Sequence, residues 1–150
     1  MSLTFLDTNI LVYRQDPEDP VKRALAGKWI ESLARARRGR LSWQVLIEYN
    51  AVASRKLVSR GLPTDSLRLD LRDYTAWRPL APDLGLFEVA WSLQDRYGFS
   101  WWDALIVAAA LRQECSVLLS EDMQHGLVID DRLTLINPFA PDAPLPPAAS

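Results

Sequence analysis

The stretch LTFLDTN, residues 3–9, is the part of the sequence that is most informative about the fold. Residues 3–6 form a short apolar run that is typical of a buried strand, and the polar residues after it lead directly into a helix. Asp7 therefore follows a buried strand, where a carboxylate costs free energy unless a neighbouring group compensates for it. A local explanation is that Asp7 or Thr8 caps the following helix.

Short apolar runs and longer helical patterns alternate along the remaining chain. Strands are predicted at residues 3–6, 41–43, 77–80, 117–119 and 133–136. Helices are predicted directly after residues 7–9 and at 21–36, 44–58, 64–74, 84–97 and 102–113, with Gly39 ending the second of them. This alternation predicts one α/β domain over residues 1–138, with a short, mostly parallel sheet flanked by helices. The Pro- and Ala-rich tail, residues 139–150, is expected to add nothing to the core.

The composition excludes several classes of protein. The chain of 150 residues is 49% hydrophobic and 24% charged, which is typical of one globular domain. Cys115 is the only cysteine and His125 the only histidine, so an intrachain disulfide and cysteine- or histidine-rich metal sites are excluded. No apolar run is long enough to span a bilayer, and the N-terminal residues lack the features of a secretory signal. The expected location is therefore the cytoplasm, with no membrane contact.

The basic residues are unevenly distributed, although the formal net charge is only −2. Fourteen of the 17 basic residues are arginine, and four of these fall at positions 35, 37, 38 and 40. Arginine suits bidentate contacts with phosphate. Cations at the C-terminal end of a helix are the simpler explanation for this cluster taken alone.

Acidic residues lie at four places where apolar elements begin or end: Asp7, Glu48, Asp103 and the pair Glu121–Asp122. Ligands of parallel α/β sheets collect beyond the carboxyl ends of the strands, and Asp7 and Asp122 both follow predicted strands. If the four carboxylates converge, they repel one another unless a divalent cation lies between them. The pattern therefore indicates a metal-dependent hydrolase.

Each acidic position also has a local explanation. Glu48 lies on or beside the apolar face of its helix, where a buried arginine partner and a metal ion explain it equally well. Asp103 follows Ser100 at the spacing of a capping box, and its place at a helix N-terminus predicts a lowered pKa. Glu121 and Asp122 lie in a turn, where acidic residues need no special reason.

Four segments together resemble a known family. They are FLDTNILVY at 5–13, SWQVLIEYN at 42–50, SWWDALIVAAA at 100–110 and LSEDMQHG at 119–126. In this order and at this spacing the chain resembles the PIN-domain ribonucleases, specifically the VapC-like toxins of bacterial toxin–antitoxin pairs. The resemblance covers the chain from residue 3 to about residue 138 and leaves the tail outside.

The resemblance implies a set of site residues and partners. The catalytic metal ligands would be Asp7, Glu48, Asp103 and Asp122. Glu121 takes the fourth place if the match slips by one residue, and Asn9 and Ser120 match supporting polar positions near the metal. The resemblance further implies Mg²⁺ or Mn²⁺ as cofactor, RNA as substrate, a homodimer, and a cognate antitoxin that holds the enzyme inactive.

The ligand chemistry and the nearby basic residues agree with a metal-dependent ribonuclease, but other functions stay open. An all-oxygen ligand set suits Mg²⁺ or Mn²⁺ better than zinc. Arg14, Arg55 and Lys56 are candidates for contacts with the RNA backbone, with ordinary surface charge as the alternative. Two other functions stay open: a PIN-like module that binds RNA or a partner protein with little catalysis, and a small phosphatase with a similar acidic site.

Overall fold

The computed structural model describes residues 2–148, and within them five strands form one sheet in the order β2-β1-β3-β5-β4. The strands are β1 (Thr4–Leu6), β2 (Gly39–Arg40), β3 (Val117–Leu119), β4 (Val128–Ile129) and β5 (Leu133–Ile136). Strand β1 pairs in parallel with β2 and β3, and β3 pairs in parallel with β5. Only β4 is antiparallel to its neighbour among the described strands. The predicted α/β class with a mostly parallel sheet is therefore confirmed.

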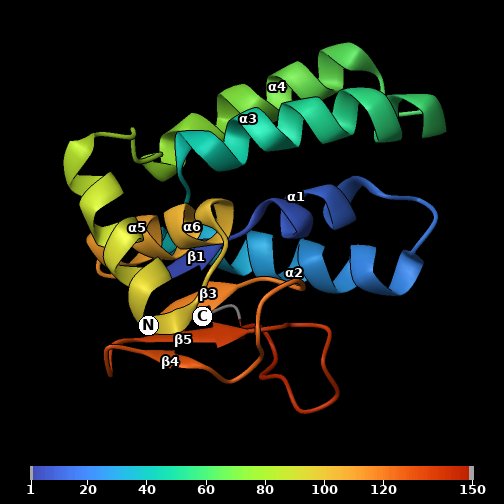
Figure 1. Ribbon diagram of the computed structural model, residues 1–150. Coiled ribbons are helices and arrows are strands. Elements are labelled where there is room, and N and C mark those ends of the chain that lie inside the picture. The colour runs from blue at the N-terminus through green and yellow to red at the C-terminus, as the bar shows by residue number, and fades with distance from the viewer. Residues whose placement is uncertain (1, 149–150) are drawn as a thin grey trace.

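The part of the chain that the structure describes has six α-helices. They are α1 (Thr8–Gln15), α2 (Pro20–Ala36), α3 (Trp43–Val52), α4 (Thr64–Tyr74), α5 (Leu84–Tyr97) and α6 (Trp101–Arg112). Helices α3 and α4 lie at the top of Figure 1, farthest from β4 and β5. Helix α1 packs against α2 and α3, α3 packs against α4, and α5 packs against α6. Within residues 2–148, no helix is both long and apolar enough to cross a membrane.

Side-chain caps explain where most of these helices begin. The caps of α1, α2, α3, α5 and α6 are Asp7, Asp19, Ser42, Asp83 and Ser100. Each side chain accepts a hydrogen bond from a backbone N–H of the first turn, which otherwise has no partner inside the helix. The capping role predicted for Asp7 is therefore confirmed, and it fixes the carboxylate at the point where β1 ends.

The centre of the core lies between the sheet and α6. Phe5 and Leu6 of β1 and Leu118 of β3 are fully buried, and α6 is buried continuously from Ala104 to Leu111. A helix that is apolar all round belongs inside a core. Because the centre is so tightly enclosed, a Leu118→Ala change should cost about 2–5 kcal/mol of stability.

The segment from residue 75 to 80 differs from the prediction of a strand at 77–80. Residues Thr75–Trp77 form a short 3₁₀ turn, Arg78 has a left-handed backbone with φ of 55°, and Leu80 makes only an isolated bridge to Ser42. Pro79 has no N–H to donate to a ladder, which explains why no strand forms there.

The neighbourhood of Gly39 also differs from the prediction. Helix α2 ends at Arg37, which adopts the left-handed conformation, and Gly39 begins β2 instead of ending the helix. The Trp77 ring lies against Gly39, because a Cβ built there would be 1.9 Å from a ring carbon of Trp77. Glycine is required for this close approach, a contact between residues distant in sequence.

Three further expectations need correction. The helix predicted at 44–58 changes after Val52 into a π-helical turn (Ala53–Leu57) and a 3₁₀ turn (Val58–Arg60). Strand β4 was not predicted, because two residues carry no readable period. The tail contributes to the packing after all, since Phe139 packs against the core and its ring lies 5.1 Å from that of Tyr13.

Candidate active site

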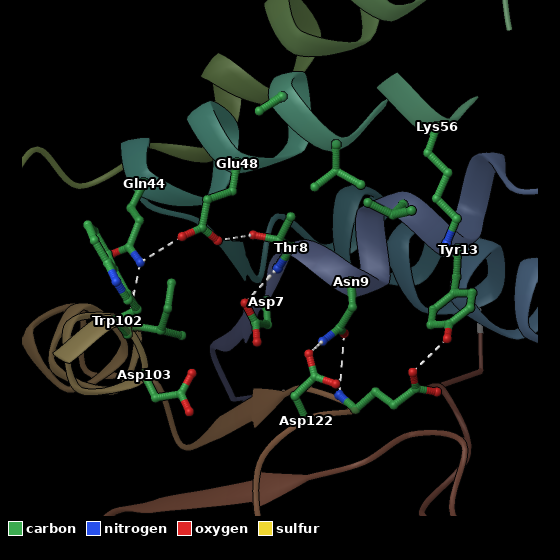
Figure 2. Close-up of a pocket in the computed structure, with 15 residues that line it drawn as sticks. Asp7, Thr8, Asn9, Tyr13, Gln44, Glu48, Lys56, Trp102, Asp103 and Asp122 are labelled. Carbon is green, nitrogen blue, oxygen red and sulfur yellow. Dashed lines mark hydrogen bonds between the residues drawn. The ribbon is translucent and has the colours of Figure 1, made fainter. Parts of the chain in front are cut away.

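A cavity of about 430 Å³ opens at the carboxyl edge of the sheet, and we call it the acidic pocket. Its lining includes the four predicted carboxylates of Asp7, Glu48, Asp103 and Asp122. They come from the end of β1, from α3, from the first turn of α6 and from the turn after β3 (Figure 2). The fold thus brings together side chains that lie up to 115 positions apart, between residues 7 and 122.

Asp7 is the most deeply buried of the four, with 8% of its surface exposed. Its Oδ1 accepts a hydrogen bond from the Thr8 N–H and its Oδ2 accepts one from the Ser120 hydroxyl, both at 2.7 Å. The net pKa of Asp7 is raised to about 6, because burial and the charges of Glu48 and Asp103, which raise it, outweigh the two hydrogen bonds, which lower it. The site therefore holds an aspartate that is costly to ionise at neutral pH.

Glu48 is half-buried and held by two neutral donors. Its Oε2 accepts a hydrogen bond from the Thr8 hydroxyl at 2.9 Å, and its Oε1 accepts one from the Gln44 side-chain amide at 3.0 Å. No ion pair of Glu48 exists within residues 2–148, so the buried arginine considered from the sequence is wrong. Thr8 and Gln44 were not predicted as site residues, although Gln44 lies one helical turn before Glu48.

Asp103 differs from the prediction in the direction of its pKa. Its N–H donates to the Ser100 hydroxyl at 3.2 Å, as the capping motif predicts. Burial raises the pKa of Asp103, the Ser100 hydrogen bond lowers it, and the charges of Asp122 and Glu48 raise it. The predicted lowering by the helix N-terminus is therefore wrong, because burial and neighbouring carboxylates outweigh it.

The adjacent acids Glu121 and Asp122 have different surroundings. The Glu121 carboxylate accepts a hydrogen bond from the Tyr13 hydroxyl at 2.6 Å and pairs with the Lys22 ammonium. Asp122 instead accepts a hydrogen bond from the Asn9 amide at 3.1 Å, and its charge acts on Asp103. Glu121 is thus neutralised by a lysine, whereas Asp122 faces another carboxylate.

Cations are scarce around the four carboxylates. Within residues 2–148, none of the four forms an ion pair, although Lys56 lines the same cavity. Carboxylates that repel one another in a partly buried site fit a divalent cation with oxygen ligands. No three acidic, histidine or cysteine side chains of the described chain are grouped closely enough to hold an ion by themselves. Mg²⁺ keeps several of its waters in proteins, so part of the contact would run through water.

Of the three basic residues predicted to contact RNA, only Lys56 lines the acidic pocket. Arg14 donates to the Tyr74 hydroxyl at 3.3 Å and lies 3.9 Å from the Asp70 carboxylate, so its guanidinium is occupied by α4. Arg55 is exposed and does not line the acidic pocket, whereas Lys56 does. Trp102 also lines it and is 64% exposed, which is unusual for so large an apolar side chain.

Comparison with known proteins identifies a family and a similar solved structure. The family model of the PIN domain matches residues 4–126. Among solved structures, a toxin–antitoxin complex from Klebsiella pneumoniae is similar with a TM-score of 0.67 and 17% sequence identity, over 91% of this chain and 98% of that chain. At this identity the likeness concerns the fold. No match was found among curated proteins.

Proposed function

The chain belongs to the PIN domain family, and we propose that it is a divalent-metal-dependent endoribonuclease and the toxin of a toxin–antitoxin pair. PIN domains are generally nucleases, and PIN nucleases generally use divalent metals. The similar structure from Klebsiella pneumoniae is a toxin–antitoxin complex, which supports an antitoxin as the partner of this chain. We also propose that the chain forms a homodimer, and this part of the proposal rests on the family resemblance alone.

One observation carries the proposal. Four carboxylates from four separate segments line one cavity, and in the described chain no ion pair neutralises any of them. Such an arrangement costs stability, since burial and mutual repulsion raise the pKa of Asp7 to about 6. A bound divalent cation removes that cost, whereas a purely structural role for the four acids does not.

The residues of the pocket divide into ligands and supports. Asp7, Glu48, Asp103 and Asp122 would hold Mg²⁺ or Mn²⁺, directly or through water. The bound ion would supply Lewis-acid activation of the scissile phosphate and of a water molecule. Thr8 and Gln44 hold the Glu48 carboxylate from both sides, and Ser120 orients Asp7. These neutral donors fix the carboxylates without adding positive charge that would compete with the ion.

The Asn9 amide group connects the two strand ends of the site. Its nitrogen donates to the Asp122 carboxylate, and its oxygen accepts from the Glu121 N–H at 3.3 Å. This bridge links α1 to the turn after β3 and aims the Asp122 carboxylate into the pocket. Because Lys22 occupies Glu121, we assign the fourth acidic position to Asp122.

The test is cleavage of RNA by the purified full chain. With Mg²⁺ or Mn²⁺ we expect new internal RNA ends, which sequencing of total RNA would map, and EDTA should abolish them. Asp103→Asn should remove the activity, whereas Asp95→Asn, an exposed aspartate on α5, serves as the matched control.

Three outcomes would contradict the nuclease. Undiminished cleavage by Asp103→Asn would assign the activity to another site or to a contaminant. RNA binding that leaves the ends unchanged would favour the non-catalytic binding module. Hydrolysis of phosphomonoesters without RNA cleavage would favour the phosphatase.

A further inference from the structure

A second cavity, of about 250 Å³, is lined by three arginines, and we call it the arginine pocket. Arg37 and Arg40 come from the end of α2 and from β2, and Arg78 comes from the segment before α5. The remaining lining residues are apolar or glycine, including Trp77 and Gly39, and no carboxylate is among them. Three positive charges therefore share one small cavity without an acid.

Favourable interaction of cations with the C-terminal end of a helix accounts for only one of these arginines. The Arg40 guanidinium donates to the backbone carbonyls of Arg37, at 3.4 Å, and Gly39, at 2.8 Å, near the end of α2. In the described chain, Arg37 and Arg78 make neither an ion pair nor a side-chain hydrogen bond, and both are exposed. Two guanidinium groups are thus available for a ligand at the mouth of the pocket.

The backbone conformation of Arg37 and Arg78 indicates that their side chains have a function, because it is one that favours glycine. Arg37 has φ of 56° and Arg78 has φ of 55°, both in the left-handed region. That conformation is unfavourable for a residue other than glycine. Glycine would be the cheaper choice at both positions, so the energetic cost of arginine suggests a use for the charge. The Trp77 ring against Gly39 gives the pocket a rigid wall.

The arginine pocket is connected to the acidic pocket by two paired segments. Residues 39–44 and 76–82 meet at an isolated parallel bridge between Ser42 and Leu80, where Trp43 N–H donates to Leu80 O and Leu80 N–H donates to Leu41 O, both at 3.0 Å. The beginning of this pair lines the arginine pocket. Its other end lines an apolar groove of about 630 Å³, which shares Gln44, Glu48 and Trp102 with the acidic pocket.

We propose that the arginine pocket binds a backbone phosphate of the RNA strand whose scissile bond lies in the acidic pocket. This inference rests on the proposed ribonuclease function. Arginine's planar fork matches phosphate oxygens, and the exposed faces of Trp43 and Trp102 along the groove offer stacking surfaces for unpaired bases. The substrate is therefore single-stranded over the stretch between the two pockets.

The experiment compares two pairs of arginines in the full chain. Fluorescence anisotropy measures the binding of labelled single-stranded RNA of about 4 and about 12 nucleotides, a range typical of such sites, in EDTA so that no metal-dependent cleavage occurs. Arg37→Gln/Arg78→Gln removes two exposed charges of the pocket and leaves Arg40 in place. Arg68→Gln/Arg72→Gln removes two exposed charges from α4 as the matched control. Thermal melting verifies that both variants fold.

The pocket variant should bind the longer RNA about tenfold more weakly than wild type, and the slope of log K against log salt should fall by about 0.7, for one lost phosphate contact. The shorter RNA, which covers less of the path between the two pockets, should lose less affinity than the longer one. Equal losses in the two variants, or equal losses for the two RNA lengths, would overturn the proposal. If the selective loss occurs but the wild type does not cleave RNA with Mg²⁺, the phosphate site stands and the proposed nuclease fails.

Discussion

The two ends of α1 carry two buried aspartates with opposite surroundings. Asp7 caps the N-terminus and is 8% exposed, and Asp16 caps the C-terminus and is 3% exposed. Burial raises the pKa of Asp16 as well, but the Glu18 N–H and the Arg60 guanidinium outweigh it, and the net pKa is lowered. The Arg60 guanidinium contacts both Asp16 oxygens, at 2.9 and 3.0 Å. Asp7 has no such cation within the described chain, and its pKa is raised.

Burial alone therefore does not indicate whether an aspartate has a structural or a functional role. A buried carboxylate with an arginine partner is a structural element, because the pair satisfies both charges. A buried carboxylate held by neutral donors and surrounded by further carboxylates keeps an unbalanced charge, and such groups cluster at functional sites. Asp7 is assigned to the proposed metal centre because no cation of the described chain neutralises its charge, and burial alone would not support that assignment.

The largest expected effect is on cleavage. Asp7→Asn should lower the rate of RNA cleavage on the order of 10³-fold, because a ligand of the proposed ion and a negative charge are lost together. Asp16→Asn should leave the rate of the folded protein within about threefold, since Asp16 lies at the other end of α1 and does not line the acidic pocket. Single-turnover kinetics at saturating Mg²⁺ measures both. Equal losses in the two variants would break the distinction between the two aspartates.

The second effect is on stability and concerns Asp16. Asp16→Asn should lower the free energy of unfolding by about 3 kcal/mol, because Arg60 Nη1 loses its carboxylate partner in a partly buried place and only the Nη2 pair with Glu18 is left. Since the pKa of Asp16 is lowered, its stabilising contribution is present at neutral pH and is lost as the pH falls. Urea unfolding at pH 7 checks the value. Unchanged stability would mean that the pair contributes nothing.

The third effect has the opposite sign and concerns Asp7. In EDTA at pH 7, Asp7→Asn should raise the free energy of unfolding by about 2 kcal/mol, since it removes a buried charge. The asparagine oxygen can still accept from the Thr8 N–H, and its NH₂ group can donate to the Ser120 hydroxyl in place of the bond that Asp7 accepts. Because folding raises the pKa of Asp7 from 3.8 to about 6, the folded state binds the proton more tightly and wild-type stability falls as pH rises through this range.

The gain from Asp7→Asn should therefore vanish below about pH 4 and reach its full size above about pH 6. Urea unfolding of both proteins across this range tests the sign, with Asp95→Asn as the control. A variant that is less stable than wild type at pH 7 would show that the Asp7 charge has a stabilising partner.

The smallest effect distinguishes the neighbours Glu121 and Asp122. Glu121→Gln should change the cleavage rate by less than about threefold, whereas Asp122→Asn should lower it by about 10–100-fold. The reason is that Glu121 is engaged by Lys22 and Tyr13, and Asp122 faces Asp103. The same single-turnover assay applies. The reverse ranking would move the fourth acidic position to Glu121.

The fold was largely predictable, because its elements have clear local signals. Helices α4 and α5 have the predicted boundaries, and β3 and β5 do as well. The errors arise where tertiary contacts decide the backbone. Trp77 lies against Gly39, and this contact joins segments that no local pattern connects. Pro79 blocks a strand that the apolar residues around it predict.

The site was predictable in its members but not in their surroundings. Asp7 and Asp122 follow strands, so a parallel sheet brings them to one edge. The hydrogen bond from Thr8 to Glu48 spans 40 positions, and the pairing of Glu121 with Lys22 spans 99, so neither has a sequence signal. The pKa of Asp103 was predicted in the wrong direction for the same reason, since its neighbours come from other elements.

The most direct test of the central claim is the binding of Mn²⁺ in the absence of RNA. Electron paramagnetic resonance of Mn²⁺ titrated into the full chain at pH 7.5 measures the free ion. We expect saturable binding by the wild type, binding at least tenfold weaker in Asp7→Asn, and unchanged binding in Asp16→Asn. Saturable binding that survives Asp7→Asn undiminished, or no binding by the wild type, would contradict this expectation.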